Sequence, residues 1–343
     1  MHMADALLSP AVGGTMWTVS AGAIIYCSRK LRQEMDGGKA PLMGVLGAFL
    51  FAAQMINFTI PVTGSSGHLG GGLLLAVLLG PAAAFITIAS VLVVQALFFA
   101  DGGLLALGCN IFNLGFFPAF IAYPFVYKPL VGNAPSKTQM TVAAMVAAVI
   151  GLQLGAFSVV LETVASGVSS LPFATFVSLM QPIHLAIGVV EGLVTGAVLF
   201  FVYQARPEII QNVQMNRALG ATPLRGILIA FLAAALLIGG FVSWFASENP
   251  DGLEWAIARV TGGEELAASS SQTGSGLHTR LAALQESVAV LPDYTFKKPE
   301  QVPEAGAGQE SPLGTSMAGI VGGLLTLALA FLSGILVKKR RRS

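Results

Sequence analysis

The chain has 343 residues, of which 55% are hydrophobic and only 10% are charged, and its formal net charge is +1. A soluble domain carries about 25% charged residues, so this composition excludes a soluble globular protein. The small net charge also gives no bulk attraction to nucleic acid. The two cysteines, Cys27 and Cys109, make neither a disulfide framework nor a metal-binding spacing. The composition therefore indicates an integral membrane protein.

Nine apolar segments follow one another along the chain. A spanning helix needs about 20 apolar residues, and all of the segments except the third reach this length. After the third segment, Gly80-Pro81 either kinks one long helix or separates two helices. The predicted spans are Ser9–Ser28, Leu42–Pro61, Leu69–Leu79, Ala82–Ala100, Leu104–Tyr127, Thr138–Glu162, Pro182–Gln204, Gly226–Ala246 and Leu313–Val337.

The positions of the basic residues distinguish between one helix and two on either side of Gly80-Pro81. Short loops rich in Lys and Arg face the cytoplasm. Only two helices put all four basic linkers on one side, so we predict nine spans with the N-terminus outside and the C-terminus inside a bacterial or archaeal cytoplasmic membrane. The four basic linkers are Arg29–Lys39, Lys128–Lys137, Arg206–Arg225 and Lys338–Arg342.

A change in composition divides the chain. We predict an all-α membrane protein with a seven-helix bundle in residues 1–205, a cytoplasmic linker at 206–225, and a two-helix extension at 226–343. The extension encloses an outside loop, residues 247–312, with ten acidic and four basic residues. Its polar composition predicts mostly disorder, apart from a short amphipathic helix at Leu277–Val290. His278, within that loop, is expected to be solvated.

The first residues have the chemistry of a metal chelate. The amine of Met1 together with the amide nitrogen and Nδ1 of His2 can close two fused chelate rings. Planar nitrogen ligation suits Ni(II) or Cu(II) and can accept Co(II), whereas zinc prefers a tetrahedral site. No secretory signal is evident, and His2 is too large for removal of Met1, so Met1 is expected to persist. A chance histidine beside the start codon is the simpler alternative.

A glycine-rich turn on the same predicted face carries His68. Its glycines permit irregular backbone at membrane depth, which is tolerated where it lines a cavity or is buried in protein. One nitrogen of His68 could supply a fourth equatorial ligand. The other would then need an acceptor, for which Ser65, Ser66 and the loop carbonyls are candidates.

Five more polar residues lie near or within the spans. Such groups are costly in lipid and usually face the bundle interior. We expect these residues to support the metal ligands or to anchor loops, and a structural hydrogen bond is the favoured role for the last two. The five are Asp101, Asn110, Asn113, His184 and Glu191.

These stretches together resemble the substrate-binding component of nickel/cobalt energy-coupling-factor importers, the NikM/CbiM type. The resemblance implies a near-planar nitrogen site made by Met1, His2 and His68, with Ni(II) or Co(II) as the transported substrate. It covers roughly residues 1–205. The matching stretches are Met1-His2 with Leu8-Ser9-Pro10, Gly67-His68-Leu69, Gln95–Gly103, Asn110–Asn113 and His184–Leu199.

Residues Pro250–Glu254 spell the PDGLE signature of the companion NikN-type subunit, so the chain resembles a fusion of the two. The resemblance implies a transmembrane coupling subunit and ATPase subunits as partners, because this chain has no phosphate-binding loop. The chain itself is then expected to be no enzyme.

Two other functions remain open from the sequence. The first is an intramembrane serine protease using Ser66 and His184, suggested by Gly64-Ser65-Ser66-Gly67. The second is an ATP-independent channel or secondary metal transporter, against which no charge pairs or inverted repeat are evident. We favour capture of Ni(II) or Co(II) at the outer face, followed by ATP-driven delivery inward. The sequence does not choose between the metals, although the PDGLE signature favours nickel slightly.

Overall fold

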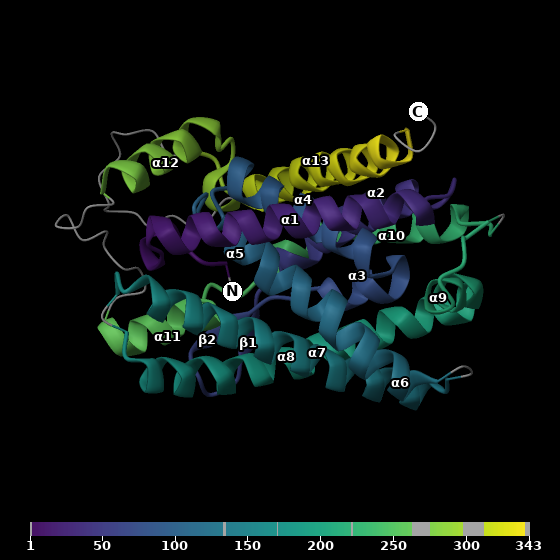
Figure 1. Ribbon diagram of the computed structural model, residues 1–343, viewed down its shortest axis with the longest axis horizontal. Coiled ribbons are helices and arrows are strands. Elements are labelled where there is room, and N and C mark those ends of the chain that lie inside the picture. The colour runs from purple at the N-terminus through teal and green to yellow at the C-terminus, as the bar shows by residue number, and fades with distance from the viewer. Residues whose placement is uncertain are drawn as a thin grey trace.

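The structure is a computed structural model that describes residues 2–132, 135–169, 171–220, 222–262, 275–297 and 312–339. Helices run along its longest axis, and the prediction of an all-α membrane protein is confirmed (Figure 1). Within the described residues, five helices are long and apolar enough to cross a membrane. These are α4 (Pro81–Phe98), the continuous helix Leu107–Val131, α7 (Lys137–Ser166), α8 (Phe173–Ala205) and α13 (Pro312–Lys339).

Each of the seven predicted segments of the first bundle contains a helix, with two differences in the bounds. The second helix ends at Gln54, and Phe58–Ile60 form a strand instead; the seventh begins earlier than predicted, at Phe173. Ser9 caps the first, its hydroxyl accepting a hydrogen bond from the amide of Val12, and Pro10 opens it. The helix Leu107–Val131 widens into a π-helix in its middle, where Pro118 and Pro124 cannot donate backbone hydrogen bonds. The remaining elements are α1 (Pro10–Glu34), α2 (Lys39–Gln54), α3 (Gly72–Leu79), α5 (Leu107–Ile111), η2 (Phe112–Tyr127) and α6 (Lys128–Val131).

The third predicted span needs correction. Gly80 adopts φ +84° and separates α3 from α4, so there are two helices at this point, as the basic linkers indicate. However, α3 has only eight residues, all buried. It is about 12 Å long, too short to cross the roughly 30 Å hydrocarbon core alone. The irregular, glycine-rich backbone before it extends its reach, and burial in protein makes this tolerable.

Helices α7 and α8 pack against each other along much of their length. Gly188, Gly192 and Gly196 lie four residues apart on one face of α8 and are buried. A Cβ at Gly188 would lie 3.0 Å from the Cα of Val149, and one at Gly196 would lie 2.9 Å from the Cα of Thr141. Small residues therefore allow the two backbones to approach, as is usual for helices in lipid.

The C-terminal part packs onto the first bundle through α10 and α13, which both contact α2. The prediction of a mostly disordered loop is wrong for the described part of it, because two helices, α11 and α12, lie between α10 and α13. The second of them matches the predicted amphipathic helix. Residues 263–274 and 298–311 lie outside the described residues. The elements are α9 (Pro207–Gln214), α10 (Arg225–Gly240), η3 (Val242–Phe245), α11 (Gly252–Thr261), α12 (Ser275–Val288), η4 (Pro292–Tyr294) and α13.

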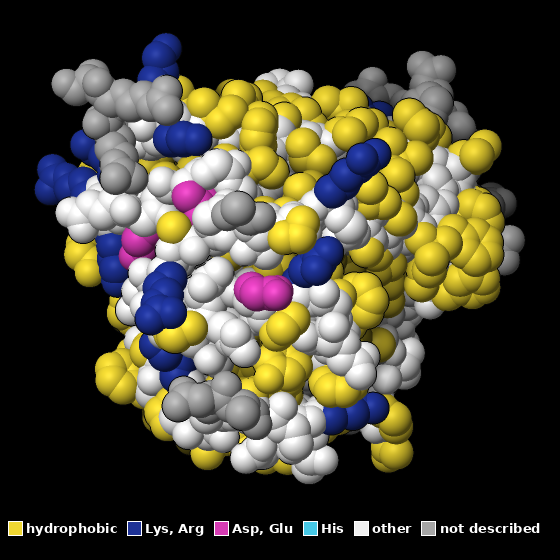
Figure 2. Space-filling model, turned by 90° about the vertical axis from the view of Figure 1, so that its right-hand side faces the viewer, with side chains coloured by type: hydrophobic (Ala, Val, Ile, Leu, Met, Phe, Trp, Pro, Cys, Tyr) yellow, Lys and Arg dark blue, Asp and Glu magenta, His cyan; other side chains and the backbone are white. Residues whose placement is uncertain are grey.

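Basic residues gather at one end of the molecule. Helices α6 and α9 and the last turn of α13 lie there, opposite α11 and α12 (Figure 1), and Lys and Arg are prominent on this face (Figure 2). Hydrogen bonds join the basic linkers to one another. The Asp36 carboxylate accepts from the amides of Leu219 and Gly220, and Lys128 donates to the carbonyl of Gln214.

Candidate metal centre

The N-terminal segment is buried and pinned to the bundle. Met3 is fully buried, and Asn110 on α5 accepts from its amide at 2.8 Å and donates to its carbonyl at 3.3 Å. The amide of Gly103 also donates to the Met3 carbonyl. Asp5 accepts from the amide of Ala106, and the short helix η1 (Asp5–Leu7) follows. Met1 lies outside the described residues, so the position of its amine stays a prediction.

The structure brings His2 and His68 together. Their rings stack with centroids 5.0 Å apart and planes inclined by 12°. Nδ1 of His2 lies 3.2 Å from a carboxylate oxygen of Asp101, and the His2 side chain is only 8% exposed. Burial lowers the pKa of the His2 imidazole. A ring that resists protonation keeps a lone pair for a metal ion.

His68 follows a short antiparallel hairpin of β1 (Phe58–Ile60) and β2 (Ser65–Gly67). Its Nδ1 lies 3.1 Å from the carbonyl oxygen of Leu69. When Nδ1 donates its proton there, the lone pair is on Nε2. Among the acceptors considered from the sequence, the structure therefore provides a loop carbonyl. Burial is the largest cause that lowers the pKa of His68, to about 3.

Ser65 and Ser66 instead contact the C-terminal part. The amide and hydroxyl of Ser66 donate to the carbonyls of Pro250 and Asn249, at 2.8 and 2.7 Å. The Ser65 hydroxyl donates to the carbonyl of Ser66 and, at 3.4 Å, to that of Pro250. Both serines thus hold the PDGLE segment rather than the ring of His68.

The residues of the PDGLE segment either cap the start of α11 or pack against the bundle. The Asp251 carboxylate caps α11 by accepting from the amides of Leu253 and Glu254. Glu254 closes the capping box, and Leu253 is buried. Gly252 faces α8, where a Cβ would lie 3.1 Å from the Cε1 of His184. A larger residue at this position would therefore require the side chains of α8 to shift.

His184 lines a small cavity together with His68 and Asp251. Its Nδ1 lies 2.8 Å from the carbonyl oxygen of Met180, one turn earlier on α8. Its Nε2 is buried and has no hydrogen-bond partner among the described residues. His184 thus faces the bundle interior, behind His68.

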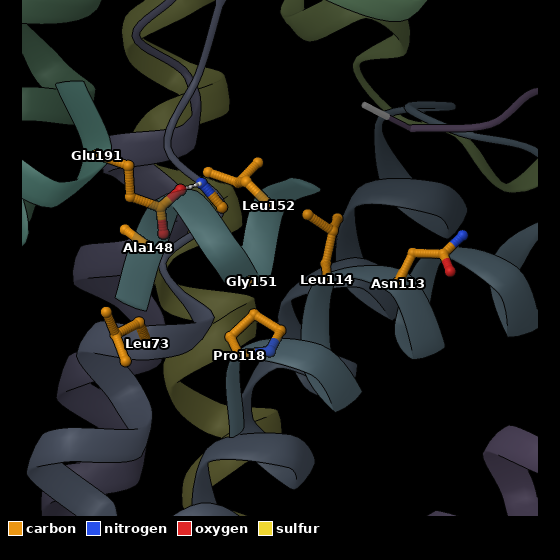
Figure 3. Close-up of a pocket in the computed structure, with 9 residues that line it drawn as sticks. Leu73, Asn113, Leu114, Pro118, Ala148, Gly151, Leu152 and Glu191 are labelled. Atoms are coloured by element: carbon orange, nitrogen blue, oxygen red, sulfur yellow. Dashed lines mark hydrogen bonds between the residues drawn. The ribbon is translucent and has the colours of Figure 1, made fainter. Parts of the chain in front are cut away.

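Glu191, two turns further along α8, holds the loop after His68. Its two carboxylate oxygens accept from the amides of Gly70 and Gly71, at 2.9 and 3.0 Å. Figure 3 shows the carboxylate of Glu191 and its hydrogen bond to the loop beside a second cavity. Leu114 and Pro118 of η2 and residues of α3 and α7 line this cavity. Glu191 therefore fixes the backbone that carries His68.

Asn113 does not reach the two stacked histidines. Its amide donates to the carboxylate of Glu162 at 2.7 Å and lies 3.9 Å from the sulfur of Met3. Asn110, by contrast, binds the backbone of Met3 directly. The two asparagines thus anchor the N-terminal segment and α7 respectively.

A second segment of the C-terminal part covers Asp101. We call residues 285–294 the strap. Gln285 donates to the carbonyls of Ala96 and Gly102, one on each side of Asp101. The Tyr294 hydroxyl donates to one oxygen of Asp101, while the other faces His2. Amides of Val290, Leu291 and Asp293 add bonds to the carbonyls of Phe98 and Phe99.

His278 is also engaged, so its predicted solvation is wrong. Its Nε2 lies 3.0 Å from the carbonyl oxygen of Leu8, just before α1. Helix α12 thereby contacts the N-terminal segment. Five residues that were not singled out as site residues from the sequence contact the two histidines, their loops or the N-terminal segment. They are Asp5, Gln54, Gln95, Asp251 and Tyr294.

In this conformation the described residues contain no cluster of three or more His, Cys, Asp or Glu that would hold a metal ion. Lone pairs of imidazole nitrogens lie in the ring plane, so two parallel stacked rings cannot both aim at one ion. A metal bound by both histidines therefore requires at least one ring to turn.

Comparisons with known proteins agree with this architecture. Residues 2–209 match the family model described as the cobalt uptake substrate-specific transmembrane region, CbiM, and residues 225–339 match the PDGLE domain. The fused nickel transport protein NikMN of Rhodobacter capsulatus is 29% identical over the full length of both chains. A NikMN relative from Archaeoglobus fulgidus is 31% identical over 96% of this chain and 97% of its own.

A solved structure is also similar. The crystal structure of a truncated transition metal transporter superposes with a TM-score of 0.53 at 28% identity, covering 60% of this chain and 99% of that chain. The matched family model spans more than half of the present chain. The chain therefore belongs to the CbiM family of cobalt uptake substrate-specific transmembrane regions, followed by a PDGLE domain.

Proposed function

We propose that the chain captures Ni(II) or Co(II) at the outer membrane face and delivers it inward as the substrate-binding part of an ATP-driven energy-coupling-factor importer. The observation that carries this proposal is the burial of His2 against His68 next to the PDGLE segment that begins α11, on the side of the molecule away from the basic linkers (Figure 1). By the positive-inside rule the basic end faces the cytoplasm, so the histidine pair faces outward.

The proposed ligands are the amine of Met1, the amide nitrogen and Nδ1 of His2, and Nε2 of His68. Two features support them: the low pKa of both imidazoles and the bond that leaves the lone pair of His68 on Nε2. To chelate, Nδ1 of His2 must leave Asp101, and the rings must leave their stacked arrangement. Planar nitrogen ligation favours nickel, and so do the names of the NikMN relatives.

The C-terminal part, residues 226–343, is proposed to be a cover for the site rather than a separate function. The PDGLE segment lies on the loop of His68, and the strap lies on the loop of Asp101. Transport is proposed to need a coupling subunit and ATPase subunits as partners. Residues 206–225 are the proposed cytoplasmic linker between the two parts.

The protease alternative lacks its essential contact. A nucleophilic serine needs a hydrogen bond to its base. The Ser66 hydroxyl donates to the Asn249 carbonyl, and Nδ1 of His184 lies against Met180. The transporter alternative without ATP is separated from ours by uptake into vesicles with and without ATP and the partner subunits.

Nickel and cobalt titration calorimetry on the purified protein tests the chelate. Adding one residue before Met1, or changing His2 to Ala, is expected to abolish high-affinity binding, because each removes nitrogens from the fused rings. The control is the same extension on a His2→Ala background, which should have no further effect. Wild-type affinity in the extended protein would refute the chelate.

A further inference from the structure

Two buried glutamines connect the loop of His68 to the surroundings of His2. Gln54, at the end of α2, donates from Nε2 to the carbonyl oxygen of Gly70 at 3.0 Å. Gln95 on α4 donates from Nε2 to Oε1 of Gln54, also at 3.0 Å. Gln54 is 5% exposed and Gln95 is fully buried.

The direction of this amide chain is fixed at one end. A carbonyl only accepts hydrogen bonds, so Gln54 must present its NH₂ group to Gly70. Its oxygen then faces Gln95, which must present its own NH₂ group. The chain therefore leaves Oε1 of Gln95 as an acceptor at the far end, and this atom has no hydrogen-bond partner among the described residues.

The ring of His2 contains the complementary group. Its Nε2 is also buried without a hydrogen-bond partner in the described part of the chain. Gln95 lies beside the residue that faces this ring, because its backbone carbonyl accepts from the amide of Asp101, whose carboxylate lies 3.2 Å from Nδ1 of His2. The pKa of His2 responds to the Gln95 side chain as well. Leaving two such buried groups unpaired is unfavourable, because neither regains the hydrogen bond to water that it lost on burial. They can pair only when Nε2 of His2 carries the proton.

Other neighbours do not compete for this role. Asp101 faces Nδ1 of His2, and its second oxygen accepts from Tyr294. The single hydroxyl proton of Tyr294 is used in that bond. Oε1 of Gln95 is thus the acceptor available for a proton on Nε2.

We propose that Gln95 is a positioning residue that selects the tautomer of His2 with the proton on Nε2, so that Nδ1 presents its lone pair to the metal. This inference rests on the proposed chelate through Nδ1. Histidine ligands commonly donate their other ring N–H to an oxygen acceptor, which fixes tautomer and orientation. In the stacked arrangement Nδ1 of His2 faces Asp101, which favours the tautomer with the proton on Nδ1. Asp101 is therefore the acceptor in the stacked position of the ring, and Gln95 is the acceptor in the metal-binding position.

The amide chain also relates the two histidine ligands to each other. One end contacts Gly70, two residues after His68, and the other end faces His2. Closure of the chelate at His2 is therefore transmitted to the backbone that carries His68.

Titration of the purified full-length protein with nickel tests the role of Gln95. Gln95→Leu keeps the size of the side chain and removes the acceptor, so the affinity should fall by about 10–100-fold, as for other groups that orient metal ligands. Gln95→Glu keeps an oxygen acceptor and should bind nickel more tightly than Gln95→Leu. A purely structural glutamine would give the opposite order, because a buried carboxylate perturbs the bundle more than leucine does.

The matched control is Gln153→Leu. The side-chain amides of Gln153 on α7 and Gln181 on α8 each donate to the backbone carbonyl of the other residue. Gln153→Leu loses the first of these bonds elsewhere in the bundle and should keep wild-type affinity. A fall equal to that of Gln95→Leu would overturn the inference.

Nitrogen NMR of histidine-labelled protein supplies a direct readout of the tautomer. The nickel-bound wild type should show the proton of His2 on Nε2 in a hydrogen bond, and Gln95→Leu should lose that hydrogen bond. An unchanged signal, or wild-type affinity of Gln95→Leu while His2→Ala abolishes binding, would overturn this inference alone. Nickel binding by the N-terminally extended protein would instead refute the proposed chelate.

Discussion

The anchoring of Met3 by Asn110 gives the sharpest test of how the N-terminal segment is held. Asn110 is 2% exposed and makes two hydrogen bonds to the backbone of Met3. Asn110→Leu keeps a side chain of similar size but can make neither bond. The carbonyl of Met3 retains the bond from Gly103, whereas its amide loses its acceptor.

The expected loss follows from these bonds. Each contributes about 1 kcal/mol net, so docking of the segment weakens by about 2 kcal/mol. Since 1.4 kcal/mol is tenfold in an equilibrium constant, the docked population relative to the undocked one falls by about 30-fold. The apparent Kd rises as the competent fraction falls, so the nickel Kd should rise by up to about 30-fold. The ligands themselves remain, so this loss should be smaller than that of His2→Ala.

Titration calorimetry in lipid nanodiscs measures this change, and hydrogen exchange at the amide of Gly103 reports docking directly. The control is Ser20→Ala, which removes a buried hydrogen bond from α1 to the carbonyl of Gly108 without touching Met3. Unchanged nickel affinity in Asn110→Leu, or an equal loss in Ser20→Ala, would refute the reasoning.

Three further outcomes are expected. His68→Ala should weaken nickel binding less than His2→Ala in calorimetry, because it removes one ligand rather than part of the fused rings; the reverse order counts against the ligand set. Gly252→Ala places a Cβ 3.1 Å from the Cε1 of His184 and should weaken docking of the PDGLE segment by about 1–3 kcal/mol. Faster hydrogen exchange at the Ser66 amide would report this, whereas Gly226→Ala, with nothing within 4 Å, should leave exchange unchanged. Burial lowers the pKa of His68 from 6.5 to about 3, so between these pH values the unfolded state binds a proton at His68 that the folded state does not bind. Thermal stability should therefore decline as pH falls from about 6.5 toward 3, and His68→Gln should flatten that decline; equal slopes would contradict it.

Most helices were predictable because a membrane span is a local property of the sequence. The long apolar runs became α4, the helix Leu107–Val131, α7, α8 and α13. Helix α3 differed because eight residues suffice where protein, rather than lipid, surrounds the helix. Gly80 could be read as a helix boundary because its positive φ ends α3 before Pro81 opens α4.

The structure of the described part of the loop between residues 247 and 312 was not predictable from its composition. Its order depends on partners far away in the chain: Pro250 accepts from Ser66, and Leu291 donates to Phe98. Polar composition reports how little apolar surface a segment buries by itself. It does not report hydrogen bonds that the backbone makes to a distant surface.

The placement of the histidines could be inferred from topology, but their orientation could not. Two short segments on one membrane face gave the proximity of His2 and His68, and the structure stacks them. Which nitrogen faces which oxygen depends on Asp101 and Leu69. Gln95 did leave a signal, since a single amide inside an apolar helix is costly in lipid unless it is bonded.

The covalent link between the two parts of the chain has a consequence for the site. The PDGLE segment holds the hairpin before His68 on one side, and the strap holds the loop of Asp101 beside His2 on the other. A separate subunit would have to be recruited to make both contacts, whereas a linked segment meets them at a high effective concentration. If His2 and His68 bind the metal as we propose, their rings turn beside these contacts, and we expect the C-terminal part to loosen when metal enters or leaves. On that proposal, the link is expected to change the rate of metal exchange more than the final affinity.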